Sequence, residues 1–215
     1  MKRLNIIIFI LLLGNISGYA LQARVTAYNK EITLRDSINE QKENEIYVTT
    51  VIEEFIEYHR VMKNNVPHSY FEKAANSSFI TLITNFYLSD KLPFDSCLAV
   101  KGGNKHIEES FREEFEEIDN EVFDREQEEA LAQNPDIITV RRCDFWNEVF
   151  EFNKEIANPE GFALIERAIK EAHHALGLDW NDTIFIGKET LSQHKAAVRD
   201  VFENMREEIN PVYLK

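Results

Sequence analysis

Apolar residues recur every three or four positions in six windows of the chain, the spacing that places them on one face of an α-helix. The first window, for example, carries Val48, Val51, Phe55 and Met62 on one stripe, with acidic residues between them. The pattern predicts helices over residues 43–62, 69–89, 105–131, 142–156, 159–176 and 190–208.

Two short runs rich in β-branched residues, 137–140 and 184–186, interrupt the helical spacing and are typical of extended segments. We expect them to pair as a two-stranded ribbon beside the helices. The chain has only 7 Gly and 5 Pro, too few for the frequent turns of a sandwich or barrel. We therefore predict an all-α fold, a single-domain bundle or irregular array of five to six amphipathic helices with this one ribbon.

Local signals also predict where some helices begin. Ser69 with Glu72, and Thr190 with Gln193, match the capping box, in which two side chains satisfy free amides of the first turn. Asn158, followed by a proline, predicts a third helix start through its side-chain oxygen.

The N-terminus has the pattern of a secretory signal peptide. Lys2 and Arg3 precede an apolar run over 4–13, and small residues follow at Gly18 and Ala20, so we expect cleavage after residue 20. The run is shorter than the roughly 20 residues needed to span a bilayer. The alternatives are an uncleaved anchor and a buried first helix.

Residues 21–42 then form a polar lead-in or a weak helix, and 43–215 form the helical domain. We expect the protein to be secreted or extracytoplasmic, and periplasmic if its source is bacterial.

Export changes how the cysteines are interpreted. Cys97 and Cys143 are the only two in the sequence, and an even count in an oxidising compartment favours one disulfide bond over two buried thiols. Asn76 and Asn181 match the N-glycosylation pattern, which matters only in a eukaryotic host.

The formal net charge is -14, which disfavours nucleic acid as an electrostatic partner. Much of this charge lies between residues 105 and 129, where twelve acids accompany three bases. We expect this stretch to be one long helix that can dock a basic protein or peptide, or bind calcium weakly on adjacent carboxylates. The alternative is a solvated face that only keeps the protein soluble. The candidate binding residues are Glu113, Glu116, Glu117 and Glu121.

Metal binding has a weak candidate in Glu171 and His174, which lie one helical turn apart as in metal sites of helical bundles. His194 or His59 can complete a mononuclear site if packing brings them near. The alternative is that these histidines are core residues bonded to backbone or carboxylate groups. The sequence has no nucleophile elbow and no phosphate-binding loop, so we predict no cofactor and no enzymatic activity.

The chain is also rich in aromatic residues, with 15 Phe, and a helical bundle can hold an apolar ligand between its helices. Aromatic stripes at helical spacing are more often core packing. We therefore expect a non-enzymatic interaction protein that presents an acidic helix to a basic partner. A helical carrier of a small apolar ligand is the first alternative, and a metal-dependent enzyme is the second.

Overall fold

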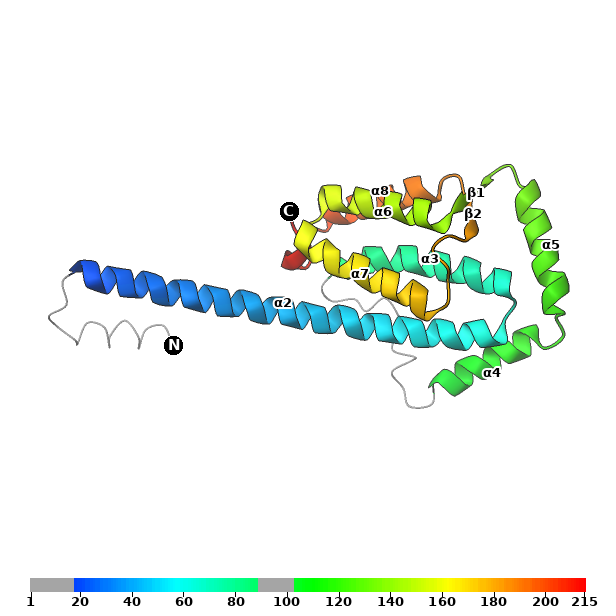
Figure 1. Cartoon of the computed structure of the whole chain (residues 1–215), viewed down its shortest axis with the longest axis horizontal. Coiled ribbons are helices and arrows are strands. Elements are labelled where there is room, and N and C mark those ends of the chain that lie inside the picture. The colour runs from blue at the N-terminus through cyan, green and yellow to red at the C-terminus, as the bar shows by residue number, and fades with distance from the viewer. Residues whose placement is uncertain (1–17, 89–102) are drawn as a thin grey trace. The chain divides into compact units, whose positions relative to one another are not determined.

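A computed structural model describes residues 18–88 and 103–215 of the chain, with side chains over 39–88 and 108–215. This part of the chain is mostly helical, which confirms the all-α prediction (Figure 1). The elements in chain order are α2 (Gly18–Asn65), α3 (His68–Phe86), α4 (Gly103–Phe115), α5 (Asn120–Gln133), β1 (Ile137–Arg141), α6 (Arg142–Ile156), α7 (Pro159–Ala175), β2 (Thr183–Gly187), α8 (Thr190–Asn204) and the 3₁₀ turn η1 (Pro211–Tyr213).

The chain divides into two compact units, residues 1–44 and 45–215. In the first unit the described backbone is the N-terminal part of α2, which begins at Gly18, well before the predicted helix over 43–62. Most of the predicted signal peptide lies outside the described residues, and it stays a prediction. Of the helices that the structure describes, none is both long enough and apolar enough to cross a membrane.

In the second unit, the predicted apolar stripes form the core. Val48, Val51 and Phe55 of α2 are completely buried, as are Phe71 and Phe79 of α3. The buried faces of α6, α7 and α8 belong to the same cluster of core residues. Helices α2, α3, α6, α7 and α8 therefore bury the faces that their spacing of apolar residues predicts.

Aromatic and imidazole rings occupy the centre of this core. Phe55 and Phe79 lie with their ring centroids 4.4 Å apart. His59 stacks on Phe55 at 4.0 Å, and His173 stacks on Phe79 at 3.9 Å. Trp146 meets His173 edge to face at 5.1 Å. This ring cluster, defined by these five residues, joins α2, α3, α6 and α7.

The predicted ribbon is present. β1 and β2 pair antiparallel, with Ile138 opposite Ile186 and Val140 opposite Ile184. Ile184 and Ile186 are buried, so this face of the ribbon packs on the core. Burial alternates along β2, as expected for a strand with one face on the core, but not along β1.

The predicted acidic helix over 105–131 is wrong as one continuous element. The structure has two helices there, α4 and α5, separated by a turn at 116–119. Asp119 ends the turn as the N-cap of α5, because its side chain accepts hydrogen bonds from the amides of Glu121 and Val122. The apolar spacing continues across the turn, which explains why periodicity alone indicates a single helix.

Helices α3 and α8 begin within one residue of the predicted starts, at His68 and Thr190, but the predicted capping boxes do not form. In neither helix does the side chain of the N-cap residue accept a cap hydrogen bond. Glu72 instead accepts from the buried guanidinium of Arg142 at 2.7 Å, an ion pair that links α3 to α6. Asn158 does cap α7, because it accepts hydrogen bonds from two amides of the first turn.

Cys143 is a free, partly exposed cysteine at the start of α6. Its predicted partner, Cys97, lies outside the described residues. The structure therefore does not contain the Cys97–Cys143 bridge, which stays a prediction.

The C-terminal segment packs against the first turn of α7. Tyr213 is completely buried, and its carbonyl accepts a hydrogen bond from the Asn158 amide at 2.9 Å. Gly161 lies beneath this segment, where a Cβ atom would come 2.4 Å from the carbonyl oxygen of Val212. This approach is possible only for a residue without a side chain.

We predict that Gly161→Ala lowers the free energy of unfolding by about 1–3 kcal/mol, the usual cost of overpacking, because the backbone of η1 has to move. Urea unfolding followed by circular dichroism measures this change. Ser192→Ala, at an exposed position of α8, is the control and should change stability by less than about 0.5 kcal/mol. Equal stabilities of Gly161→Ala and the unsubstituted protein would contradict the described packing.

Candidate interaction surface

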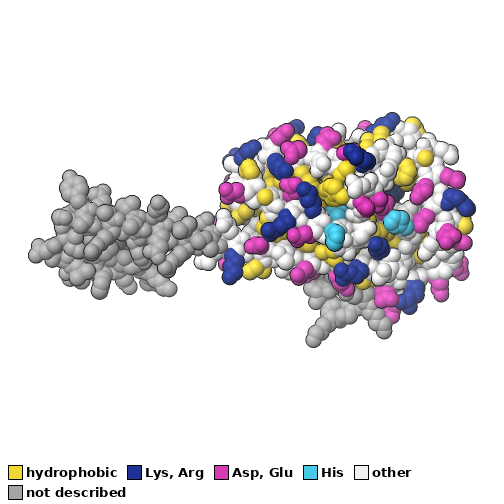
Figure 2. Space-filling model, viewed as in Figure 1, with side chains coloured by type: hydrophobic (Ala, Val, Ile, Leu, Met, Phe, Trp, Pro, Cys, Tyr) yellow, Lys and Arg dark blue, Asp and Glu magenta, His cyan; other side chains and the backbone are white. Residues whose placement is uncertain are grey.

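The helices α4 and α5 and the turn between them carry a dense set of exposed carboxylates. Figure 2 shows Asp and Glu side chains along the edge of the molecule that α5 follows in Figure 1. We define the acidic surface as the exposed acids of this stretch: Glu109, Glu113, Glu114, Glu116, Glu117, Asp119, Glu121, Glu126, Glu128 and Glu129. It includes all four of the binding residues predicted from the sequence.

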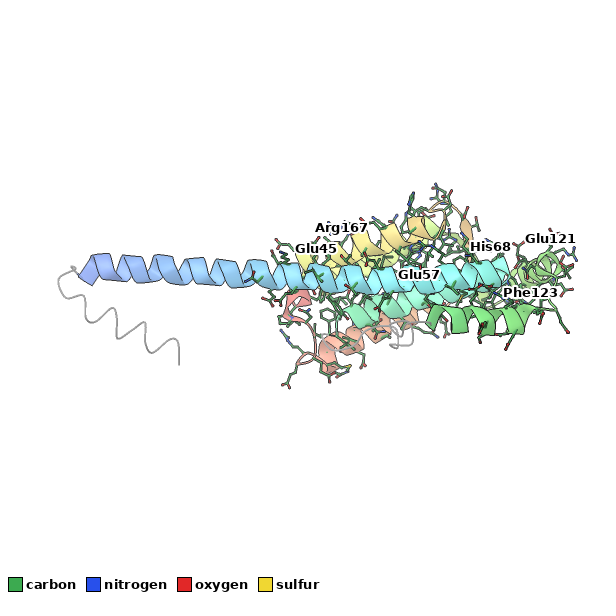
Figure 3. All side chains as sticks on the ribbon, turned by 90° about the horizontal axis from the view of Figure 1, so that it is seen from below. Glu45, Glu57, His68, Glu121, Phe123 and Arg167 are labelled. Atoms are coloured by element: carbon green, nitrogen blue, oxygen red, sulfur yellow. The ribbon has the colours of Figure 1, made fainter. Side chains whose placement is uncertain are left out.

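Ring contacts join α4 to the bundle, and α5 lies against α3. Phe115, at the end of α4, packs edge to face on Tyr70 of α3 at 4.9 Å, and Phe111 contacts Tyr58 of α2 at 6.1 Å. α5 has no buried residue at all. Figure 3 labels Glu121 and Phe123 on this helix. The two helices therefore contribute little to the core and expose most of their side chains to solvent.

One carboxylate of α5 has a structural role. Asp124 accepts hydrogen bonds from the amides of His68 and Ser69 and from the Ser69 hydroxyl, at 2.6–3.1 Å. It therefore caps α3 from another helix, 55 residues away from Ser69. Burial acts to raise the pKa of Asp124, but these hydrogen bonds outweigh it and hold the pKa below its usual value. The sequence shows no signal for this contact.

The predicted binding residues keep their charges available. Glu113, Glu116, Glu117 and Glu121 are exposed, and none forms an ion pair with another described residue. Arg112, which lies among them, pairs with Glu108 at 2.6 Å. These four carboxylates therefore have no described ion-pair partner that a basic ligand would have to displace.

The weak metal candidates do not come together. Glu171 and His174 are exposed on α7, whereas His194 is 2% exposed and bonds to Asn153 of α6. Within the described part of the chain, no three His, Cys, Asp or Glu side chains are grouped so that they could hold a metal ion.

His194 belongs to a buried hydrogen-bond network instead. The Asn153 amide nitrogen donates to the Val149 carbonyl at 2.7 Å and to His194 Nε2 at 3.0 Å, while its oxygen accepts from the Tyr87 hydroxyl. Nε2 is therefore an acceptor, and the ring is neutral with its proton on Nδ1. Burial, with a smaller effect of Lys195, lowers the pKa of His194 to about 4.

Burial also keeps the imidazole rings of His59 and His173 neutral. In each ring Nδ1 donates to the carbonyl four residues earlier, Phe55 and Ile169 respectively, at 2.9 Å. Burial lowers the pKa of each imidazole to about 4, although the hydrogen bond opposes the shift. The histidines on apolar helix faces are thus core residues rather than ligands.

The two glycosylation candidates differ in accessibility. Asn181 is exposed in the turn before β2, whereas Asn76 is only partly exposed in the middle of α3. Their modification stays a prediction.

Comparisons with protein-family models, curated proteins and solved structures found no match.

We predict that the protein loses stability in mild acid. The three buried histidines have pKa values of about 4 in the folded state, below the ordinary value of 6.5, so between pH 6.5 and 4 the unfolded chain binds more protons. Stability is therefore fully present above pH 6.5 and falls as the pH decreases through this window. From pH 7 to pH 5 the loss is on the order of 2 kcal/mol per histidine.

Urea unfolding at pH 7, 6 and 5 measures this loss. His174→Asn removes an exposed imidazole and is the control that should keep the same pH dependence. A free energy of unfolding that is the same at pH 7 and pH 5 would show that the buried rings are not held neutral.

Proposed function

We propose that the protein is a non-enzymatic interaction protein whose acidic surface on α4 and α5 binds a basic protein or peptide. The observation that carries this proposal is the exposure of Glu113, Glu116, Glu117 and Glu121 without ion-pair partners. Charges on other helices are often paired, such as Arg167 with Glu45 at 3.1 Å (Figure 3). Four exposed like charges without described ion-pair partners attract an oppositely charged partner and increase its association rate.

The attachment of α5 to the bundle also supports a role in binding a partner. A helix that buries no residue adds little to the stability of the core, and α5 is kept in place by Asp124 at its edge. Side chains of such a helix are available for binding.

The aromatic residues that suggest a carrier of a small apolar ligand pack against one another in the core. Phe55, Phe79 and Trp146 are completely buried and lie within 4.4–5.8 Å of a neighbouring ring of this set. Such contacts favour core packing over ligand binding. A fluorescent fatty acid that gains no emission on mixing with the protein would support the interaction role over the carrier.

We further propose that the protein acts outside the cytosol and contains the Cys97–Cys143 bridge. The charged, apolar and small-residue segments at the N-terminus support export, and the cysteine count supports the bridge.

Binding to a basic probe tests the proposed role. Fluorescent decalysine should bind, and the triple variant Glu113→Lys, Glu116→Lys, Glu117→Lys should weaken its affinity about tenfold or more, because attraction at the contact becomes repulsion. Raising the salt concentration should weaken binding steeply, since exposed charges are screened. Fluorescence anisotropy at 50 and 300 mM NaCl measures both effects.

The matched control is Glu171→Lys, Glu203→Lys, Glu207→Lys, which changes the net charge equally at exposed positions elsewhere. It should weaken binding by less than about threefold. Equal losses in both triple variants, or binding that salt does not affect, would argue against a localised acidic surface.

Mass spectrometry tests the proposed export and bridge. Protein recovered from the medium or periplasm of an expressing host should begin at Leu21 and take up iodoacetamide only after reduction, on two cysteines. Cys143→Ser should leave Cys97 reactive without reduction. Full-length protein in the cytosol, or two reactive thiols before reduction, would refute the respective proposal.

A further inference from the structure

The ribbon of β1 and β2 has a free edge whose backbone groups can be identified from its hydrogen bonds. At one end the Arg142 amide donates to the Asp182 carbonyl at 2.8 Å, and at the other the Lys188 amide donates to the Asp136 carbonyl at 2.8 Å. Hydrogen-bonded and non-hydrogen-bonded pairs alternate along an antiparallel ladder. These two bonds therefore fix which residues of β1 face β2.

In this register, Ile138 and Val140 direct their amides and carbonyls to β2. Ile137, Thr139 and Arg141 direct theirs to the outer side of β1. These three residues define the outer edge of β1. The ribbon has no third strand within the described part of the chain, so no strand pairs with this edge.

Four backbone groups on the outer edge have no hydrogen-bond partner among the described residues. The Ile137 amide is used by the turn, because it donates to the Asn134 carbonyl at 3.1 Å. The Arg141 carbonyl is used by α6, whose N-cap residue is Arg141. The Ile137 carbonyl, both groups of Thr139 and the Arg141 amide remain, and they match the needs of one added strand.

The outer edge of β1 is also accessible. Thr139 and Arg141 are exposed, and Ile138 between them is an exposed apolar residue at 37%. On the outer edge of β2, Thr183 is exposed, whereas Phe185 and Gly187 are partly buried. Of the two outer edges, the one on β1 is therefore the more open to an incoming chain.

Charge indicates the kind of chain that fits. Glu128 and Glu129 in α5 and Asp136 before β1 are exposed acids close in sequence to the strand. Arg141, the one base of β1, is paired with Asp144 through two hydrogen bonds of 2.8 Å, and Lys188 is an exposed base at the end of β2. A second copy of this acidic chain would bring like charges together, whereas a basic segment would be attracted.

We propose that the outer edge of β1 binds an extended basic segment of the partner as a third strand. This inference rests on the proposed function and gives its binding mode. Backbone hydrogen bonds to the outer edge provide affinity, as in other cases of strand addition. A β-branched residue opposite Ile138 contacts its exposed side chain, and flanking Lys or Arg residues face the acidic surface.

A nine-residue peptide of alternating Lys and Val, added to the full chain, tests the proposal. On binding, the amides of Thr139 and Arg141 should exchange at least about tenfold more slowly with deuterium, as expected for newly bonded groups. The amides of Thr183 and Phe185, on the other edge of the ribbon, should not change. Nuclear magnetic resonance of the protein resolves these positions.

Thr139→Pro removes one of the open amides without removing a bond to β2, and should weaken peptide binding about tenfold or more. Thr183→Pro is the matched control at the other edge and should leave the affinity unchanged. Methylating alternate peptide nitrogens tests the same bonds with the unsubstituted protein, so it decides the question even if Thr139→Pro fails to fold. One methylation pattern should abolish binding and the other should not.

The outcomes separate this inference from the proposed function. Salt-sensitive binding that depends on Glu113, Glu116 and Glu117, but neither protects Thr139 nor responds to methylation, would overturn strand addition alone. No binding of any basic peptide would overturn both. Protection of Thr139 without peptide, together with a dimer in sedimentation, would overturn the proposal in favour of a second copy.

Discussion

Contact between buried rings of α2, α3, α6 and α7 is the interaction on which the rest of the structure depends. Phe55, Phe79 and Trp146 have no exposed surface, and burial of a large apolar side chain stabilises a fold by about 1.5–3 kcal/mol. His59 and His173 extend the same stack, and each satisfies its Nδ1 proton within its own helix. Because an imidazolium would be costly at this depth, both rings have to be neutral for the helices to pack as they do.

Because an apolar core excludes charged side chains, the many acidic residues lie at the surface of the bundle. Twelve of the 38 acidic residues lie in one stretch, in α4, α5 and the turn between them. Ring contacts and the cap that Asp124 gives to α3 hold this stretch to the bundle. The core therefore does not depend on the charges of the acidic surface. This independence is what makes an interaction role physically reasonable, since the carboxylates can bind a partner without disturbing the bundle. The ribbon at the end of α5 adds a backbone edge beside the same charges.

The sequence predicts the helices and the ribbon well because their patterns are local. Stripes such as the one through Val48 and Phe55 recur over several turns, and the β-branched runs are short and distinct. The break at Asp119 is missed because the apolar spacing continues across it. The capping box of Ser69 and Glu72 does not form because both residues have partners distant in sequence: Ser69 donates to Asp124, and Glu72 accepts from Arg142. Contacts between residues 55 or 70 apart leave no periodic signal.

The protonation state of His59 and His173 is the most direct test of the ring-packed core. Long-range proton–nitrogen spectra of the ¹⁵N-labelled protein report which imidazole nitrogens carry protons. At pH 5.5, where a histidine at its ordinary pKa of 6.5 is mostly charged, His59 and His173 should still show one protonated nitrogen, Nδ1. Signals from imidazolium rings at both positions in the folded protein would contradict the ring-packed core.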